Sequence, residues 1–193
     1  MSPTRTSLFP VAALVAASLL PCPAFAGDLV RGVRYKLSAG DLSSGQAAAE
    51  AYRKKTGVDA EYLDAVGWLA RGAQMLGRPD LAAGYVAELR REVPAEKADL
   101  LLPLGAAIEV EGKLRFARDG RGAAVAFLEG EAARAKDVAL RSRIRKSIDL
   151  LTLEGQPAPP LGLSDHVGPA PKALAELKGR PVLLFLFARW CGD

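Results

Sequence analysis

The chain has 193 residues, enough for one domain of ordinary size or two small ones. Half of its residues are hydrophobic, a quarter are charged and the net charge is +4, which is the composition of a globular protein without a strong attraction for anionic partners. Aromatic residues make up 6% of the chain and form no cluster on which bases could stack, so a nucleic-acid-binding function is not expected.

Residues 1–26 have the features of a secretion signal that is removed from the mature protein. Arg5 supplies a positive charge, residues 8–20 are apolar, and Ala24-Phe25-Ala26 forms a cleavage site of the Ala-x-Ala type. The apolar run is short for a membrane-spanning helix and is interrupted by a proline. We therefore expect an exported, periplasmic protein that begins near Gly27. An uncleaved leader, with residues 8–20 as a membrane anchor, is the alternative.

The cysteines favour a reactive thiol over a structural disulfide. The chain holds two, Cys22 and Cys191, and the first would be lost with the leader. The mature chain would then have one cysteine and no internal disulfide bond. In an oxidising compartment an unpaired cysteine is either reactive or awaits a partner.

The middle of the chain is predicted to be helical. Residues 27–42 are expected to be irregular because glycines interrupt a short alternating stretch, whereas residues 43–153 show apolar residues at helical spacing. Ser43-Ser44 is predicted to cap the first helix of this all-α domain, and Pro79 to begin a later one. The expected apolar faces are Leu63, Val66, Ala70 and Ala73; Leu81, Tyr85 and Leu89; Ala107, Val110, Leu114 and Ala117; and Leu140, Ile144, Ile148 and Leu151.

Two segments of the helical region resemble each other. Ala82-Ala-Gly-Tyr-Val86 and Ala124-Val-Ala-Phe-Leu128 lie 42 residues apart, and each follows a Gly-Arg turn. This spacing suits a helical-hairpin repeat of the tetratricopeptide-like kind, which would provide a surface for a partner. Two copies do not establish a period, however, and a plain helical bundle is the favoured interpretation of the same residues.

Other polar residues of the chain suggest no metal or cofactor site. Arg141, Arg143, Arg145 and Lys146 form the densest basic cluster, which we interpret as the solvated face of an amphipathic helix. His166, the only histidine, has no companion for a metal site or a catalytic triad and is interpreted as a surface loop residue.

The sequence changes character after Gly155. Prolines within residues 156–160 exclude the interior of a helix and indicate a domain boundary. Residues 173–177 are predicted to form a short helix, and residues 182–187 a strand covered on both faces, because every residue of that run is apolar. The strand leads directly to Trp190-Cys191-Gly192-Asp193.

This C-terminal order of residues resembles the thioredoxin superfamily, and within it the exported thiol–disulfide oxidoreductases and redoxins of the TlpA type. The resemblance covers residues 157–193. It implies the first elements of an α/β thioredoxin-like fold, left incomplete, behind a mainly α, helical-hairpin bundle. The residues that carry it are Ala158-Pro159, Gly168, Leu174, Leu177-Lys178-Gly179, Pro181-Val-Leu-Leu-Phe185, Ala188 and Trp190-Cys191-Gly192.

The resemblance also implies a role for each motif residue. Cys191 would be the nucleophile of disulfide exchange with exported proteins, and an upstream donor would supply electrons. A helix N-terminus behind the sulfur would favour its thiolate. Trp190 would pack beside the sulfur at the substrate surface. Gly192 and Asp193 would separate Cys191 from a resolving cysteine, and we hypothesise that the acidic Asp193 makes the pair more reducing.

The remaining elements of a thioredoxin-like domain would follow Asp193, so the chain is expected to be a fragment that is inactive alone. Residues 182–187 would then be uncovered, and the C-terminal part would be disordered, packed on the helices or prone to aggregate. Two other functions stay open. One is a partner-binding helical scaffold. The other is a peroxiredoxin-type thiol peroxidase, although such enzymes usually carry threonine where Ala188 stands.

Overall fold

The computed structural model describes residues 27–158, 160–162 and 165–185. Within these ranges the protein is mainly α-helical, as predicted, and no residue is assigned to a strand. Two short 3-10 helices are present, η1 (Ala98–Leu100) and η2 (Leu174–Leu177). The α-helices are α1 (Asp28–Ser38), α2 (Leu42–Thr56), α3 (Ala60–Met75), α4 (Pro79–Glu92), α5 (Leu101–Asp119), α6 (Arg121–Arg134) and α7 (Val138–Thr152).

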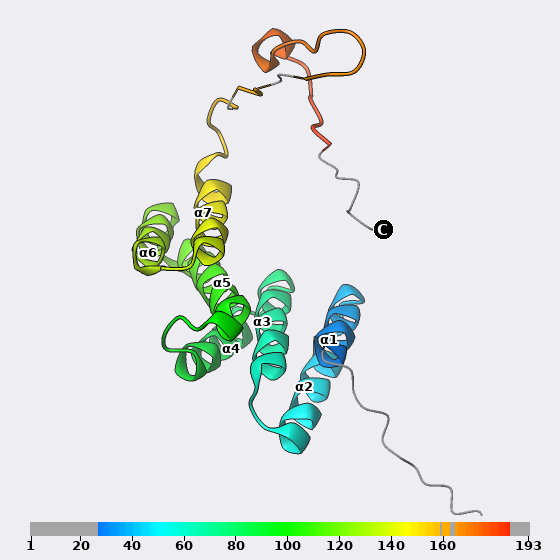
Figure 1. The fold of residues 1–193 in the computed structure, drawn as a ribbon, viewed down its shortest axis with the longest axis vertical. Coiled ribbons are helices and arrows are strands. Elements are labelled where there is room, and N and C mark those ends of the chain that lie inside the picture. Colours follow the sequence, from blue (N-terminus) through cyan, green and yellow to red (C-terminus); the bar gives the residue numbers. More distant parts are fainter. Residues whose placement is uncertain (1–26, 159, 163–164, 186–193) are drawn as a thin grey trace, which may run out of the picture.

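The helices form successive hairpins arranged in two layers (Figure 1). Helix α1 packs against α2, α3 against α4, and α5 against α6. The odd-numbered helices α1, α3, α5 and α7 also pack against one another in succession. The backbones of α2, α4 and α6 do not pack against one another, and these helices are joined by ion pairs between long side chains, Arg53 with Glu88 and Arg90 with Glu131. The odd-numbered helices therefore form one continuous layer, and each even-numbered helix packs onto two neighbours of that layer.

The core lies between the two layers and is apolar. Among the described residues no charged side chain is fully buried, and the largest buried side chains include Leu69 of α3, Ile108 of α5 and Leu128 of α6. Helices α3 and α5 approach closely at Gly67, where an added Cβ would lie 2.9 Å from the Cβ of Ala106. Glycine is required there because neither helix backbone can move away without opening the core.

The predicted apolar faces are confirmed for two helices and revised for two. Leu63, Val66, Ala70 and Ala73 of α3 are all buried, as are Leu140, Ile144 and Ile148 of α7, while Leu151 of the predicted α7 face is partly buried against the core. In α4 the buried residues are Ala82, Val86 and Leu89, whereas Leu81 is 36% exposed, so the predicted face of Leu81, Tyr85 and Leu89 is wrong by part of a turn. In α5, Ala117 is exposed because it lies in the last turn, beyond the buried residues of that helix.

The prediction that residues 27–42 are irregular is wrong, because residues 28–38 form α1. Gly32, in the middle of this helix, lowers its intrinsic stability by about 1 kcal/mol relative to alanine. Burial more than offsets that cost: Val33 is fully buried, and Leu37 packs against the core from the same helix. The helical domain therefore begins at residue 28 and not at residue 43.

Helix α2 also begins earlier than predicted. Its first residue is Leu42, and the N-cap is Asp41, whose carboxylate accepts a hydrogen bond from the backbone N–H of Ser44 at 3.0 Å. The sequence Ser43-Ser44 lies inside the first turn and does not cap it. A single residue, Gly120, connects α5 to α6, and its φ of +85° is unfavourable for residues other than glycine.

After α7 the chain leaves the helical layers as a long irregular segment (Figure 1). The short helix predicted at residues 173–177 is present as η2, and Gly168 lies in a bend with a φ of +92°. The buried strand predicted at residues 182–187 is not formed over its described part: Leu183 is 92% exposed and Phe185 is 81% exposed. A central strand needs cover on both faces, and Leu183 and Phe185 do not have it.

Candidate functional site

The predicted reactive motif, Trp190, Cys191, Gly192 and Asp193, lies outside the described residues. The structure does describe the approach to it, where the apolar side chains Val182 to Phe185 are not covered by the helices. His166 is exposed, as expected for a loop residue. The structural account of a site therefore concerns the helical domain.

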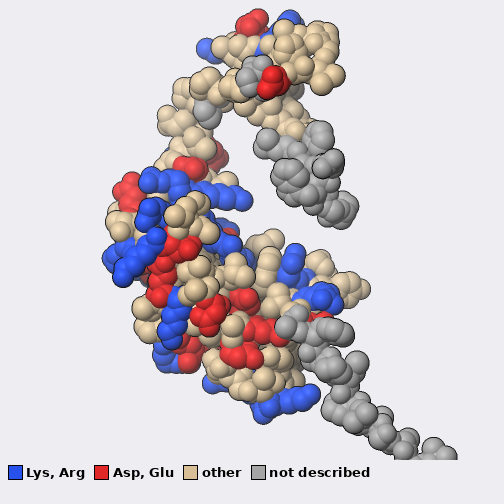
Figure 2. Space-filling view, viewed as in Figure 1, with Lys and Arg blue, Asp and Glu red and all other residues tan. Residues whose placement is uncertain are grey.

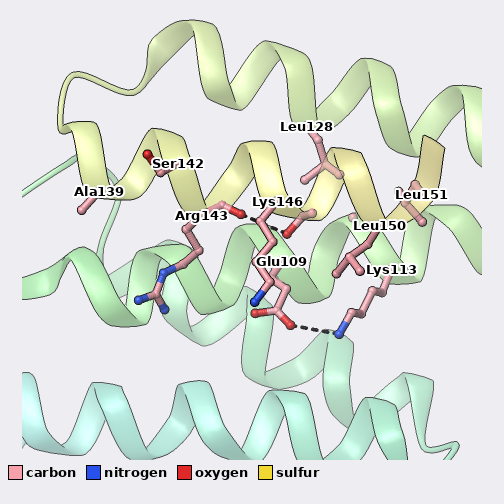
Figure 3. A pocket seen from close by; sticks show the side chains of 11 residues that line it. Glu109, Lys113, Leu128, Ala139, Ser142, Arg143, Lys146, Leu150 and Leu151 are labelled. Carbon is pink, nitrogen blue, oxygen red and sulfur yellow. Dashed lines mark hydrogen bonds and ion pairs between the residues drawn. The ribbon is translucent and has the colours of Figure 1, made fainter. Parts of the chain in front are cut away.

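A cleft lies in the layer of odd-numbered helices, between α5 and α7 (Figure 3). Its volume is about 540 Å³, and Leu128 of α6 forms part of its floor. Figure 3 shows Glu109 and Lys113 from α5 on the same side of the cleft as Arg143 and Lys146 from α7. The cleft therefore combines an apolar base with several charged groups.

Glu109 joins two cations in this cleft. Its carboxylate accepts a hydrogen bond from Lys113 Nζ at 2.9 Å and another from Arg71 Nε of α3, also at 2.9 Å. Burial of Glu109 acts to raise its pKa, but the hydrogen bond from Lys113 and the charges of Arg71 and Lys113 outweigh burial, and the pKa is lowered. Glu109 is therefore ionised at neutral pH and is already neutralised by its partners.

Arg143 and Lys146 differ, because neither forms an ion pair with any described residue. Arg143 lies across α5 at Gly105, where an added Cβ would be 2.8 Å from Arg143 Cδ. Glycine at this position lets the arginine lie flat against the helix. Arg143 and Arg71 act to lower the pKa of Asp64 on α3, but burial dominates and raises that pKa.

A second, smaller hollow of about 310 Å³ continues the same face between α1 and α3. Trp68 lines this hollow, and two guanidinium groups lie over its ring. The guanidinium carbon is 4.6 Å from the ring centroid for Arg34 and 5.2 Å for Arg71. Arg71 lines this hollow and Glu109 lines the larger cleft, so their ion pair joins the two. We call the two hollows together the odd-helix face, because their lining residues come mainly from α1, α3, α5 and α7.

Several charged side chains elsewhere on the domain form ion pairs. Arg90 of α4 contacts Glu111 at 2.9 Å and Glu131 at 3.3 Å, Arg115 contacts Glu111 at 2.8 Å, and Arg134 contacts Glu131 at 2.6 Å. Figure 2 shows Lys and Arg gathered over the part of the domain formed by α6 and α7. Arg143 and Lys146, which line the cleft, are among the cations that form no ion pair with a described residue.

The interpretation of the basic cluster on α7 needs one correction. Arg141, Arg145 and Lys146 are exposed, as a solvated face requires, but Arg143 is half-buried and lines the cleft together with Lys146. Sequence reasoning did not select Glu109 or Lys113 either. The available signal was weak: Gly105, Glu109 and Lys113 lie four residues apart, so they share one face of α5.

Comparison of the chain with protein-family models, with curated proteins and with solved structures found no match. No helix among the described residues has the length and apolar character needed to cross a membrane. Nor does that part of the chain bring together three or more histidine, cysteine, aspartate or glutamate residues in a way that could hold a metal ion. What the protein does must therefore be inferred from its own residues.

Proposed function

We propose that this protein is an exported thiol–disulfide oxidoreductase of the thioredoxin-like kind, with Cys191 as its nucleophile. The observation that carries the proposal is the order of residues before and around Cys191, from Ala158-Pro159 to Trp190-Cys191-Gly192. The exposure of Leu183 and Phe185 is consistent with it, because a run this apolar needs a cover that the helical domain does not provide.

The proposed chemistry is exchange of one disulfide bond for another. The Cys191 thiolate attacks one sulfur of a disulfide in an exported protein; a new bond to Cys191 forms, the substrate disulfide breaks, and the departing thiolate takes up a proton. A second thiol then attacks the mixed disulfide and frees the substrate, so the substrate gains two electrons that an upstream thiol donor must replace. Trp190 packs beside the sulfur at the surface that meets the substrate.

The helical domain is proposed to be a tetratricopeptide-like array of hairpins that binds a partner. The alternation of the two layers supports this, because each odd-numbered helix contacts the next. The 42-residue offset supports it as well. Ala82 and Ala124 are both fully buried at equivalent places in α4 and α6, and Val86 and Leu128 are buried one turn later.

Reaction with a small aromatic disulfide tests the proposed chemistry. The protein purified from the cells that make it should release one equivalent of aromatic thiolate, and mass spectrometry of the peptide that contains Cys191 should show the mixed disulfide. The Cys191→Ser variant should show neither. A Cys191 that reacts no faster than free cysteine would oppose the proposal, whereas a Cys191 that is selectively oxidised by peroxide would favour a thiol peroxidase.

A second candidate function, a scaffold that binds a partner, is favoured by the cations of the cleft. Arg143 and Lys146 line the cleft and form no ion pair with a described residue, so a segment rich in aspartate and glutamate would complement them. A fluorescent ten-residue glutamate-rich peptide is a suitable probe. Arg143→Gln combined with Lys146→Gln should weaken its binding about tenfold, at up to about 1 kcal/mol for each exposed charge.

The matched control removes two positive charges elsewhere, by combining Arg121→Gln with Arg145→Gln. Both arginines are exposed, and neither lines the cleft. Equal weakening in the two double variants would mean that the peptide responds only to net charge, and the scaffold candidate would lose its support. Binding that is unchanged by Cys191→Ser would separate this function from disulfide exchange.

A further inference from the structure

The start of α1 is held by a carboxylate from another helix. Glu61, in the first turn of α3, accepts two hydrogen bonds at Oε1, from the backbone N–H of Gly27 and from that of Leu29, both at 2.9 Å. Gly27 is the N-cap of α1, has a φ of +97° and has no side chain with which to cap the helix. Glu61 therefore supplies, from 34 residues away in the sequence, the capping acceptor that α1 lacks.

The position of this contact coincides with the predicted processing site. The Ala24-Phe25-Ala26 motif predicts cleavage of the peptide bond between Ala26 and Gly27. Hydrolysis there by a signal peptidase uses one water molecule and leaves a carboxylate on Ala26 and an α-ammonium group on Gly27. The nitrogen that becomes charged is the same nitrogen that lies 2.9 Å from Glu61 Oε1.

We propose that Glu61 is a binding site for the α-ammonium group that removal of the leader creates, so that processing strengthens the folded helical domain. Before cleavage the contact is a neutral N–H donating to a carboxylate. After cleavage it is an ion pair with hydrogen bonding, which is roughly twice as strong. The proposal depends on the predicted cleavage site and is independent of the chemistry of Cys191.

The surroundings make a counter-charge necessary at this place. A positive charge at the first turn of a helix opposes the helix dipole, so an unpaired ammonium group would weaken α1. Three other carboxylates lie in the neighbourhood. Asp28 follows Gly27 and forms an ion pair with Arg31 at 3.1 Å, and Asp64 lies one turn along α3 from Glu61. Asp59, the N-cap of α3, accepts a hydrogen bond from the Tyr52 hydroxyl at 2.8 Å, and this bond raises the pKa of Tyr52 to about 12.

The test compares two mature chains that differ only in where they begin. One starts at Gly27 and the other at Ala26, so both carry one α-ammonium group, but in the second it is displaced by one residue, about 3.8 Å along the chain. We expect the chain that starts at Gly27 to have a melting temperature about 2 to 4 °C higher. In the Glu61→Gln background the two chains should melt within about 1 °C of each other, because the amide oxygen still accepts a hydrogen bond but carries no charge.

Asp28→Asn provides the control, because it removes a nearby carboxylate that is not the proposed partner. In this variant the chain that starts at Gly27 should still melt at a higher temperature than the chain that starts at Ala26. NMR titration of the α-amine gives a second readout that does not depend on melting. Its pKa should lie above the ordinary range of about 7.7 to 8.0 in the chain that starts at Gly27 and within that range in the chain that starts at Ala26.

Three results would overturn the proposal. The first is an equal melting temperature and amine pKa for the two starts. The second is a difference that survives Glu61→Gln. The third is an exported protein whose N-terminal residue, determined by mass spectrometry, is not Gly27.

Discussion

The helical region, residues 28–152, and the segment that follows it, residues 153–185, differ in how far their apolar side chains are buried. In the helical region the core faces of the helices pack against one another, so Leu69 and Ile108 are almost completely buried. In the later segment the most apolar run is uncovered, and Leu183 and Phe185 are mostly exposed. The helical region has the contacts of a finished core, whereas the apolar run of the later segment still needs a cover.

The largest expected difference is between leucine-to-alanine substitutions in the two regions. Leu69→Ala leaves a cavity at the centre of α3 and should lower the free energy of unfolding by about 2 to 5 kcal/mol. Leu183→Ala removes an exposed side chain and should change it by no more than about 0.5 kcal/mol. Urea denaturation followed by circular dichroism measures both. Similar losses in the two variants would mean that residues 182–185 pack against the helices, and the contrast between the regions would be wrong.

A smaller effect, with opposite signs, is expected for two glycines within helices. At Gly67 an added methyl group would lie 2.9 Å from the Cβ of Ala106, so Gly67→Ala should destabilise the protein by about 1 to 3 kcal/mol. At Gly84 in α4 nothing lies within 4 Å of an added Cβ, so Gly84→Ala should stabilise it by about 0.5 to 1 kcal/mol. Thermal unfolding compares the two. Stabilisation by both substitutions would show that α3 and α5 are farther apart than described.

The smallest effect concerns the ionised cap of α2. Hydrogen bonds from the side chain and backbone of Ser44 lower the pKa of Asp41 from its ordinary 3.8 to about 2. A lowered pKa in the folded state means that the ionised carboxylate stabilises the protein fully above about pH 4, and that this stabilisation is lost as the pH falls towards about 2.

Asp41→Asn isolates this effect, since asparagine caps helices about as well as aspartate but does not ionise. The wild-type protein should melt at a higher temperature than the variant at pH 6, and the two melting temperatures should converge as the pH falls from about 4 to about 2. A difference that is constant across this range would exclude ionisation of Asp41 as its cause.

The sequence predicted the helical domain because its signals are local. The positions of Leu63, Val66 and Ala70 follow from helical spacing alone, and proline at position 79 begins α4 as expected. Helix α1 was not predicted because the residues that stabilise it lie far away in the sequence. Val33 is buried by packing against other helices, and the N-terminal cap comes from Glu61. Local propensity, weakened by Gly32, gave the wrong answer.

The odd-helix face could not be predicted for a similar reason. Arg143 belongs by its spacing to the basic surface of α7, and only the absence of a side chain at Gly105, on another helix, lets it lie in the cleft. Likewise, Arg71 and Glu109 form an ion pair between α3 and α5 although they lie 38 residues apart in the sequence. Conversely, the proposed role of Cys191 depends on the sequence, because the structure describes the chain only as far as residue 185 in this region.

The central claim, that Cys191 is an activated nucleophile, is tested most directly by the pH dependence of its alkylation. The protein would be purified from the cells that make it and treated with iodoacetamide over a range of pH, and the labelled Cys191 peptide would be quantified by mass spectrometry. A thiolate favoured by its surroundings should give a midpoint well below the ordinary cysteine pKa of about 8.5. A midpoint at or above that value, together with no mixed disulfide, would contradict the proposed exchange chemistry.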